Sequence, residues 1–154
     1  MNKNKAIFLD RDGVINKNKI NYVTTLEELE ILPSIGNSIK KLKNNNYFVI
    51  VITNQSPINR KLMTHEQLNK IHSFIQNHLK FFDTSIDKFY FCPHMPQENC
   101  NCRKPKPGLI IQAKNDFKID LSQSFMIGDS QTDVEAAENA GCKGILLKQN
   151  QKKY

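Results

Sequence analysis

The sequence predicts an α/β fold in which helices cover both faces of a parallel sheet. Two observations predict it. Five apolar stretches are nearly continuous, as in strands buried on both faces, and helical patterns separate them. Strands that alternate with helices in this way are typical of a parallel sheet. The chain has 154 residues, of which 39% are hydrophobic and 24% charged, so we expect residues 1–154 to form a single globular domain.

The strands are expected, in chain order, at Lys5–Asp10, Tyr47–Thr53, Lys88–Cys92, Ser124–Gly128 and Lys143–Lys148. Each helix between them has a sequence signal at one end. Pro33 precedes the first helix, Thr64 and Gln67 form a capping box before the second, Pro107 can open the third, and Gly141 ends the fourth. Only the Pro- and Cys-rich segment 92–108 fits neither kind of element.

Charge and hydropathy limit the partners. The formal net charge is +7, but the lysines are spread along the chain. We therefore expect attraction of a small anionic substrate, or plain solubility, rather than a nucleic-acid groove. No apolar run approaches the ~20 residues that span a bilayer, and the N-terminus lacks the pattern of a signal peptide. We expect a cytoplasmic monomer without a membrane partner.

Two carboxylates follow the first strand. In the stretch IFLDRDGVIN, Asp10 and Asp12 are two residues apart and would share one face of a continuing strand. Two like charges this close repel each other and are costly to desolvate, unless a cation lies opposite them. A single Asp at a strand end is more often a cap or turn residue, so the other strand ends decide the interpretation.

Polar residues also follow the second and fourth strands and precede the third helix. They are Thr53, Asn54, Gln55, Ser56, Arg103, Lys104, Asp129 and Asp133. Ligands of open α/β sheets bind beyond the carboxyl ends of the strands, so we expect these side chains to share one rim with the two carboxylates.

A shared rim would have the chemistry of phosphoryl transfer. Asp10, Asp12 and Asp129 would form a carboxylate cluster suited to Mg²⁺. Thr53 and Lys104 would supply a hydroxyl group and a positive charge for a phosphoryl group. Two roles remain open for Asp133, which either hydrogen-bonds around the metal or caps the following helix.

The same residues carry a resemblance to a known family. FLDRDGVIN, VITNQS, the lysine of CRKPKPG, and MIGDSQTD resemble the four ordered motifs of the haloacid dehalogenase superfamily of phosphatases. The resemblance implies a Rossmann-like fold, Mg²⁺ dependence and an aspartyl-phosphate intermediate. It implies that Asp10 is the nucleophile, and that Asp12 protonates the leaving oxygen and then activates water. Asp10, Asp129 and the Asp12 backbone carbonyl would hold Mg²⁺, while Thr53 and Lys104 would position and neutralise the phosphoryl group.

No inserted cap domain is expected, because the gaps after Asp12 and after Thr53 are both short. The site should therefore be open, with loops as its only walls.

The Cys-rich loop has the spacing of a zinc site. Its pattern C-x-H-x₅-C-x-C places four soft ligands close together, as in tetrahedral Zn²⁺ sites: Cys92, His94, Cys100 and Cys102. Unpaired thiols, disulfides and a catalytic Cys–His pair are the alternatives. The lack of a secretion signal disfavours disulfides, and two further cysteines at ligand spacing disfavour the catalytic pair. We expect a structural Zn²⁺ that orders the loop leading into Arg103 and Lys104.

The remaining cysteine and histidines are assigned no chemistry. Cys142 reads as a small buried residue. The three histidines of the second helix are expected to be surface or groove residues: His65, His72 and His78.

The zinc loop further resembles one subgroup of the superfamily, which contains heptose bisphosphate 7-phosphatases and histidinol-phosphate phosphatases. DRDGVIN followed by NYV, and NQSPINRKLMT, resemble the heptose enzymes, whereas the short zinc loop resembles the histidinol-phosphate branch. The expected substrate is a small phosphorylated sugar, first of all a heptose bisphosphate for a surface polysaccharide, with histidinol phosphate as the alternative. The residues expected to bind it are Asn54, Gln55, Ser56, Arg60 and Arg103.

Two further readings stay open. An open site could accept a phosphorylated polynucleotide end, which the positive charge would suit. A zinc-stabilised nucleic-acid-binding module without activity would explain the cysteines and the charge, but it leaves the carboxylates unexplained, because they repel nucleic acid unless Mg²⁺ is present.

Overall fold

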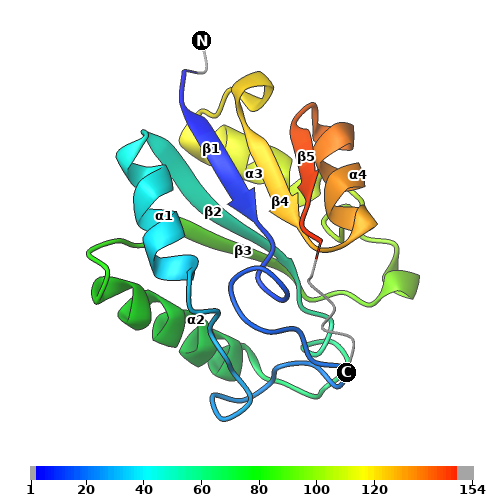
Figure 1. The fold of residues 1–154 in the computed structure, drawn as a ribbon. Helices are drawn as coiled ribbons and strands as arrows, with labels where there is room; N and C mark the ends of the chain where they lie inside the picture. The colour runs from blue at the N-terminus through cyan, green and yellow to red at the C-terminus, as the bar shows by residue number, and fades with distance from the viewer. Residues whose placement is uncertain (1–2, 149–154) are drawn as a thin grey trace.

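A sheet of five parallel strands runs through the middle of the molecule (Figure 1). The computed structural model describes residues 3–148. The strand order is β3-β2-β1-β4-β5. The strands are β1 (Lys5–Leu9), β2 (Tyr47–Asn54), β3 (Lys88–Cys92), β4 (Phe125–Gly128) and β5 (Lys143–Leu146). The predicted α/β class, the parallel sheet and the five strands are confirmed; β3 has the predicted bounds, and each of the other strands differs at one end by one or two residues.

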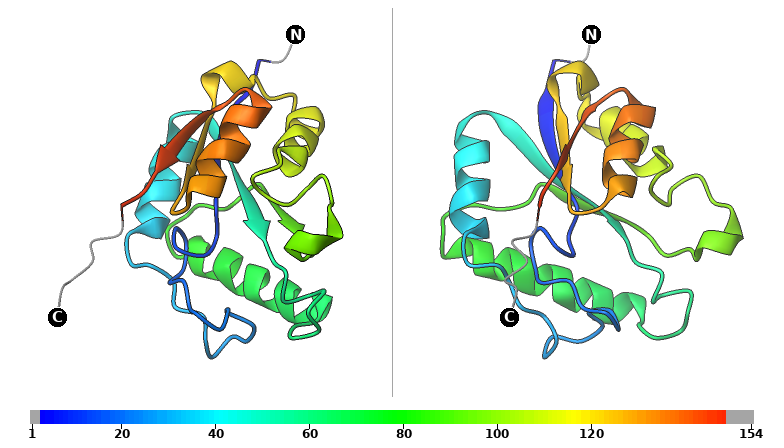
Figure 2. Two further views of the ribbon diagram at one scale, coloured as in Figure 1. Left: turned by 90° about the vertical axis from the view of Figure 1, so that its right-hand side faces the viewer. Right: turned by 45° about the vertical axis from the view of Figure 1, so that its right-hand side comes forward.

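Helices cover both faces of this sheet, as predicted. Figures 1 and 2 show α1 (Ile35–Asn44) and α2 (His65–Lys80) on one side, and α3 (Gly108–Phe117) and α4 (Gln131–Ala140) on the other. Successive residues of a strand point to opposite faces. Ile7 and Leu9 of β1 therefore pack in the α1–α2 core, whereas Ala6 and Phe8 pack in the α3–α4 core. Full burial of a side chain the size of Ile7, Leu9 or Phe8 contributes about 1.5–3 kcal/mol.

The helix ends are set by the signals read from the sequence. Thr64 Oγ1 accepts a hydrogen bond from the Gln67 N–H at 3.1 Å, and Gln67 Oε1 accepts one from the Thr64 N–H at 2.8 Å, so the capping box is formed. Pro107 directly precedes α3, and Gly141 ends α4 in the left-handed conformation. An N-cap of this kind contributes about 1 kcal/mol.

The expectation that every strand is covered on both faces is wrong for β5. Ile145 and Leu146 are 42% and 44% exposed. Among the described residues β5 pairs only with β4, and as an edge strand it has fewer neighbours to cover its apolar side chains.

The strand order reverses beside β1, and this reversal positions the site. From β1 the chain builds outward to β2 and β3, then returns to the other side of β1 with β4 and β5. In open α/β sheets, the crevice at such a reversal is where ligands bind, beyond the carboxyl ends of the strands. Asp10 follows β1 and Asp129 follows β4, so both lie at this crevice.

Within residues 3–148 no separate cap domain covers the crevice. Segments 10–34 and 55–64 follow β1 and β2 as loops without a helix or sheet of their own. In the same described part of the chain, the apolar stretches of the helices are too short to traverse a bilayer.

Candidate active site

Asp10 stands at the centre of the site. Its backbone N–H donates to the Ile127 carbonyl at 3.0 Å, which ties the end of β1 to β4. Its carboxylate oxygen Oδ1 accepts hydrogen bonds from the Arg11 N–H at 2.9 Å and from Lys104 Nζ at 3.0 Å. The carboxylate is therefore fixed in orientation before any ligand binds.

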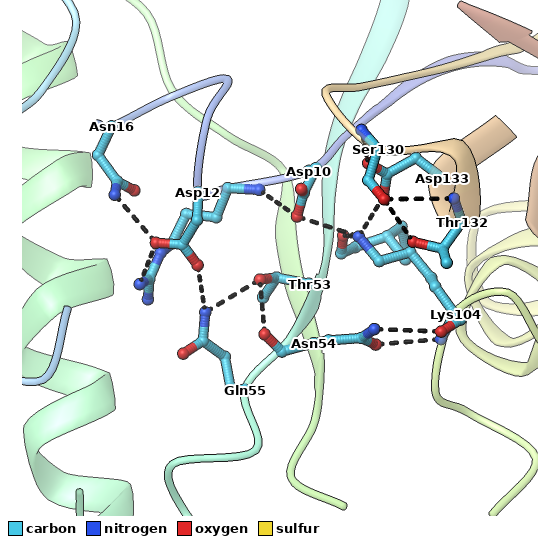
Figure 3. Close-up of polar contacts among 12 residues, drawn as sticks. Asp10, Asp12, Asn16, Thr53, Asn54, Gln55, Lys104, Ser130, Thr132 and Asp133 are labelled. Atoms are coloured by element: carbon cyan, nitrogen blue, oxygen red, sulfur yellow. Dashed lines mark hydrogen bonds and ion pairs between the residues drawn. The ribbon is translucent and has the colours of Figure 1, made fainter. Parts of the chain in front are cut away.

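Lys104 brings a positive charge from the Cys-rich loop into the crevice. The residue is 5% exposed. Its ammonium group donates to Asp10 Oδ1 at 3.0 Å, to Asp133 Oδ1 at 2.6 Å and to the Ile52 carbonyl at 2.8 Å (Figure 3). Burial alone would lower the pKa of this lysine, but the two carboxylates outweigh burial and raise the pKa, so the ammonium stays charged.

Three carboxylates converge around this lysine. Asp10, Asp129 and Asp133 each offer an oxygen, and these oxygens lie within 4.8 Å of one another. Burial raises the pKa of Asp10 to about 7 with the help of neighbouring carboxylates and against the effect of Lys104. Burial, followed by the charge of Asp133, also raises the pKa of Asp129. One ammonium group does not neutralise three neighbouring carboxylates. Their oxygen atoms are suitable ligands for a hard divalent cation.

Two glycines make room for these carboxylates. A Cβ atom on Gly13, whose φ is +89°, would lie 1.9 Å from Asp129 Oδ2. A Cβ atom on Gly128 would lie 2.0 Å from Asp133 Oδ2. Both distances are far below contact, so a larger residue at either position would displace an acidic side chain of the cluster.

The Gly13→Ala variant is expected to need a much higher Mg²⁺ concentration for activity, because the new methyl group displaces the Asp129 carboxylate. Gly141→Ala is a matched control, since Gly141 has the same φ of +89° but no atom within 4 Å of its added Cβ. Both variants pay a backbone strain of order 1–3 kcal/mol. A Mg²⁺ titration of phosphatase activity separates them, and equal half-saturation for both variants would contradict the predicted clash.

Asp12 is held differently from the other carboxylates. Its Oδ1 accepts hydrogen bonds from Arg11 Nη2 at 2.8 Å and Asn16 Nδ2 at 3.0 Å, and its Oδ2 accepts one from Gln55 Nε2 at 2.9 Å (Figure 3). Burial raises the pKa of Asp12, but the Arg11 charge and the hydrogen bonds outweigh burial and lower it. The Asp12 carboxylate does not belong to the oxygen cluster around Lys104. Any contribution from Asp12 to the predicted Mg²⁺ site would therefore come from its backbone carbonyl.

The polar residues at the end of β2 and just after it mainly position other side chains. Gln55 Nε2 bridges Asp12 Oδ2 and the Thr53 hydroxyl, at 2.9 and 3.0 Å. Asn54 forms a reciprocal pair with the Lys104 backbone: Oδ1 accepts from its N–H at 3.0 Å, and Nδ2 donates to its carbonyl at 3.3 Å (Figure 3). Ser56 Oγ accepts a hydrogen bond from Arg60 Nε at 3.0 Å. That Asn54, Gln55 and Ser56 bind substrate stays a prediction.

Asp133 caps the following helix, which is one of the two roles that its sequence position left open, and hydrogen bonding around the metal stays a prediction. With Ser130 it forms the capping box of α4. Its side chain is also 1% exposed and ion-paired with Lys104, so it anchors the ammonium group. The i to i+3 spacing from Ser130 predicts the cap, whereas the pairing with Lys104 depends on a contact between segments 29 residues apart.

The soft ligands of the Cys-rich loop also converge. Cys92 Sγ lies 3.3 Å from His94 Nδ1 and 3.6 Å from Cys100 Sγ, and His94 Nδ1 lies 3.2 Å from Cys102 Sγ. Ligands of a tetrahedral zinc with bonds of about 2.0–2.3 Å are separated by about 3.5 Å, so these distances fit Zn²⁺. The four atoms lie within 4.8 Å of one another.

This cluster supports the loop that delivers Lys104. The Arg103 N–H donates to Cys100 Sγ at 3.3 Å, and Arg103 Nη1 donates to the His94 carbonyl at 3.2 Å. Glu98 of the same loop accepts hydrogen bonds from the Asn59 side chain at 3.1 and 3.2 Å. The loop is thereby joined to the segment after β2. Arg60 in that segment is exposed, and its guanidinium carbon lies 6.0 Å from the centre of the Tyr22 ring.

His72 is not a surface residue, which corrects one half of its prediction, but it lines a groove between α2 and β3, which was the other half. His72 is 8% exposed, and its Nε2 lies 3.4 Å from Nη1 of Arg11, which is fully buried. The sequence contained a signal for this burial, because His72 follows Leu68 by four residues and precedes Ile75 by three, on the apolar stripe of α2. Cys142 is buried, as expected.

Comparisons with known proteins agree with this geometry. The HAD-hydrolase-like family profile matches residues 101–153. A D-glycero-beta-D-manno-heptose-1,7-bisphosphate 7-phosphatase of Helicobacter pylori (strain ATCC 700392 / 26695) is 47% identical over 148 residues, which are 96% of this chain and 85% of the relative. A D-glycero-alpha-D-manno-heptose-1,7-bisphosphate 7-phosphatase of Campylobacter jejuni subsp. jejuni is 38% identical over 151 residues, 98% of this chain and 86% of the relative.

A solved structure gives the same result. The D,D-heptose 1,7-bisphosphate phosphatase of B. bronchiseptica, complexed with magnesium and phosphate, superposes with a TM-score of 0.89 at 35% identity, covering 94% of this chain and 80% of that one. The relatives cover nearly the whole chain, including every strand end that contributes to the site. This chain therefore belongs to the D-glycero-D-manno-heptose-1,7-bisphosphate 7-phosphatase family of HAD-like hydrolases.

Proposed function

We propose that this protein removes the 7-phosphate of a D-glycero-D-manno-heptose 1,7-bisphosphate through an aspartyl-phosphate on Asp10, and so supplies heptose for a surface polysaccharide. One observation carries the proposal. Asp10 lies at the strand-order reversal with Lys104 Nζ 3.0 Å from its Oδ1 and two further carboxylates beside it. That arrangement gives a nucleophile, a charge for the phosphoryl group and a divalent cation site in one place.

Magnesium fits the oxygen donors of this crevice. Asp10, Asp129 and the Asp12 backbone carbonyl would hold it, and the magnesium and phosphate bound by the B. bronchiseptica relative support a magnesium ion in this fold. When bound, Mg²⁺ supplies positive charge to the phosphoryl oxygens and offsets the repulsion between the carboxylates. Lys104 adds a second positive charge beside Asp10.

The reaction then has two steps on the residues of this chain. An Asp10 oxygen attacks phosphorus, the bond from phosphorus to the sugar oxygen breaks, and Asp12 gives its proton to that oxygen. In the second step Asp12 takes a proton from water, the water oxygen attacks phosphorus, and inorganic phosphate leaves while the Asp10 carboxylate is restored. The negative phosphate beside Asp12 favours the protonated carboxyl group that the first step needs.

Substrate preference is the direct test. Phosphate release is measured with Mg²⁺ for both anomers of the heptose bisphosphate, for histidinol phosphate and for a 3′-phosphorylated oligonucleotide, with the Asp10→Asn variant as the blank. The relatives include both anomeric specificities, at 47% and 38% identity, so the anomer is the quantity to determine. We expect the highest kcat/KM for one heptose anomer. A preference for histidinol phosphate or the oligonucleotide would overturn the proposed substrate while leaving the phosphatase chemistry intact.

We also propose that the Cys-rich cluster holds one structural Zn²⁺, and that the protein works in the reducing cytoplasm, where its thiols stay free for the metal. Cys102→Ser is expected to lower zinc affinity more than about 100-fold. The variant should also lose phosphatase activity, because Lys104 follows the loop directly.

Cys142→Ser is the matched control for the zinc prediction, because it changes a buried thiol outside the cluster. It should keep a full zinc content by elemental analysis. Equal zinc content in both variants would rule out the cluster as the binding site.

A further inference from the structure

Arg11 is a fully buried arginine between the two catalytic carboxylates of the first motif. Its Nη2 donates to Asp12 Oδ1 at 2.8 Å, its Nη1 lies 3.4 Å from His72 Nε2, and its Nε has no hydrogen-bond partner among the described residues. Burying a guanidinium costs several kcal/mol, which a single carboxylate offsets only in part. Folding stability alone therefore gives no account of this arginine, which indicates a role in the reaction.

His72 contacts the guanidinium group of Arg11 through its ring nitrogen Nε2. A guanidinium N–H can only donate, so the facing Nε2 must be the unprotonated acceptor of a neutral imidazole. Burial and the nearby Arg11 charge lower the pKa of His72 to about 3, which agrees with a neutral ring. The ring stacks on Phe89 of β3, with 4.2 Å between centroids and 15° between planes. Both α2 and β3 thus hold the imidazole in place.

The donors on Asp12 are distributed unequally between its two oxygens. Oδ1 accepts two hydrogen bonds, from Arg11 and Asn16, whereas Oδ2 accepts one, from Gln55. A carboxylate oxygen has two lone-pair sites, so Oδ1 is saturated and Oδ2 keeps one acceptor position. Since Gln55 also contacts Thr53, Oδ2 is the oxygen on the side of the phosphoryl-binding residues.

We propose that Arg11 and His72 are a positioning pair that fixes the Asp12 carboxylate so that Oδ2 exchanges the proton with the leaving oxygen and with water. His72 holds Arg11, and Arg11 holds Oδ1. The inference rests on the proposed role of Asp12 as acid and base. Neither residue touches the substrate in this account, so their loss should affect proton transfer and leave phosphoryl binding almost unchanged.

The test compares two substrates of the Mg²⁺-loaded enzyme, whose leaving groups differ in whether they must be protonated in order to leave. A sugar alkoxide needs a proton to leave, whereas the nitrophenolate of para-nitrophenyl phosphate does not. His72→Phe keeps an aromatic ring that can stack on Phe89 but removes the acceptor. We expect its kcat/KM for the heptose bisphosphate to fall about 10- to 100-fold. For para-nitrophenyl phosphate it should fall less than about threefold.

Three further variants identify the cause. His72→Gln restores a hydrogen-bond acceptor and should recover most of the lost kcat/KM for the heptose bisphosphate. Arg11→Lys keeps the positive charge but lacks the planar guanidinium group, so it should show the same selective loss. His78→Phe makes the same substitution six residues further along α2 and should leave both substrates unaffected. An equal loss for both substrates in His72→Phe, or no loss at all, would overturn the positioning role.

The Asp12→Asn variant separates this inference from the proposed function. Asp12→Asn could lower kcat/KM selectively for the sugar substrate while His72→Phe and Arg11→Lys do not. That result would contradict only the positioning role of Arg11 and His72. If Asp12→Asn instead lowered kcat/KM equally for both substrates, Asp12 would not be the acid. The positioning role, which depends on that assignment, would then also be wrong.

Discussion

The Asp10→Asn variant is expected to lose at least about 10³-fold in kcat for the heptose bisphosphate. An amide is a much weaker nucleophile than a carboxylate and cannot form the phosphorylated enzyme. The substitution preserves shape, and Lys104 keeps its 2.6 Å contact with Asp133. Because burial raises the pKa of Asp10 to about 7, folding already disfavours its ionised form at neutral pH, and a neutral amide should not lower the stability of the metal-free protein.

The measurement combines single-turnover phosphate release with thermal unfolding. Asp83→Asn is the matched control, because it makes the same chemical change at an exposed residue that precedes β3, at the opposite end of the sheet. Asp83 has a φ of +54°, a conformation that Asn tolerates well. Turnover of Asp10→Asn close to that of Asp83→Asn would mean that another group attacks phosphorus.

Lys104→Met should have the second-largest effect. The variant removes the ammonium that contacts Asp10, Asp133 and the Ile52 carbonyl. Loss of one such preorganised donor typically costs 10²–10³-fold in kcat, about 3–4 kcal/mol of transition-state stabilisation. It also leaves two carboxylates without their buried counter-charge, which costs about 3–5 kcal/mol of folding stability.

A magnesium dependence distinguishes this charge effect from ordinary misfolding. The stability lost in Lys104→Met should be regained in part with saturating Mg²⁺, because the cation offsets the same repulsion. Lys106→Met serves as the control, since Lys106 is exposed two residues further along the loop and its ammonium group donates to the Cys100 carbonyl. If Mg²⁺ stabilised the two variants by the same amount, the ammonium would not be the counter-charge of the cluster.

Much of this site can be predicted from the sequence because its signals are local. Nearly continuous apolar runs indicate buried strands, and the topology of a parallel sheet brings their polar ends to one edge. Asp10, Thr53 and Asp129 could therefore be placed at one rim without coordinates. The clustering of Cys92, His94, Cys100 and Cys102 could be predicted equally well, because the four residues lie within eleven positions of sequence.

The parts that could not be predicted depend on contacts between distant segments. Helical periodicity assigns a residue to a face, but it does not say which side chain lies opposite. His72 meets Arg11 across 61 residues of sequence, and Asn54 meets the Lys104 backbone across 50. The apolar stripe of α2 signals that His72 is buried, but a histidine and an arginine both count as polar in a hydropathy pattern, so the sequence does not indicate that the two are buried as a pair.

The pairing of β1 with β4 has a consequence for how this enzyme can be assembled. Ala6 donates to the Ser124 hydroxyl at 2.9 Å, a contact across 118 residues, and Asp10 donates to Ile127 at 3.0 Å. Asp10 and Asp12, the proposed nucleophile and acid, come from the first half of the chain, whereas Lys104 and Asp129 come from the second. Contacts this distant in sequence carry the largest loop-closure cost of the fold. Catalytic competence therefore cannot precede closure of the whole chain, and regain of phosphate release during refolding reports the docking of its two halves.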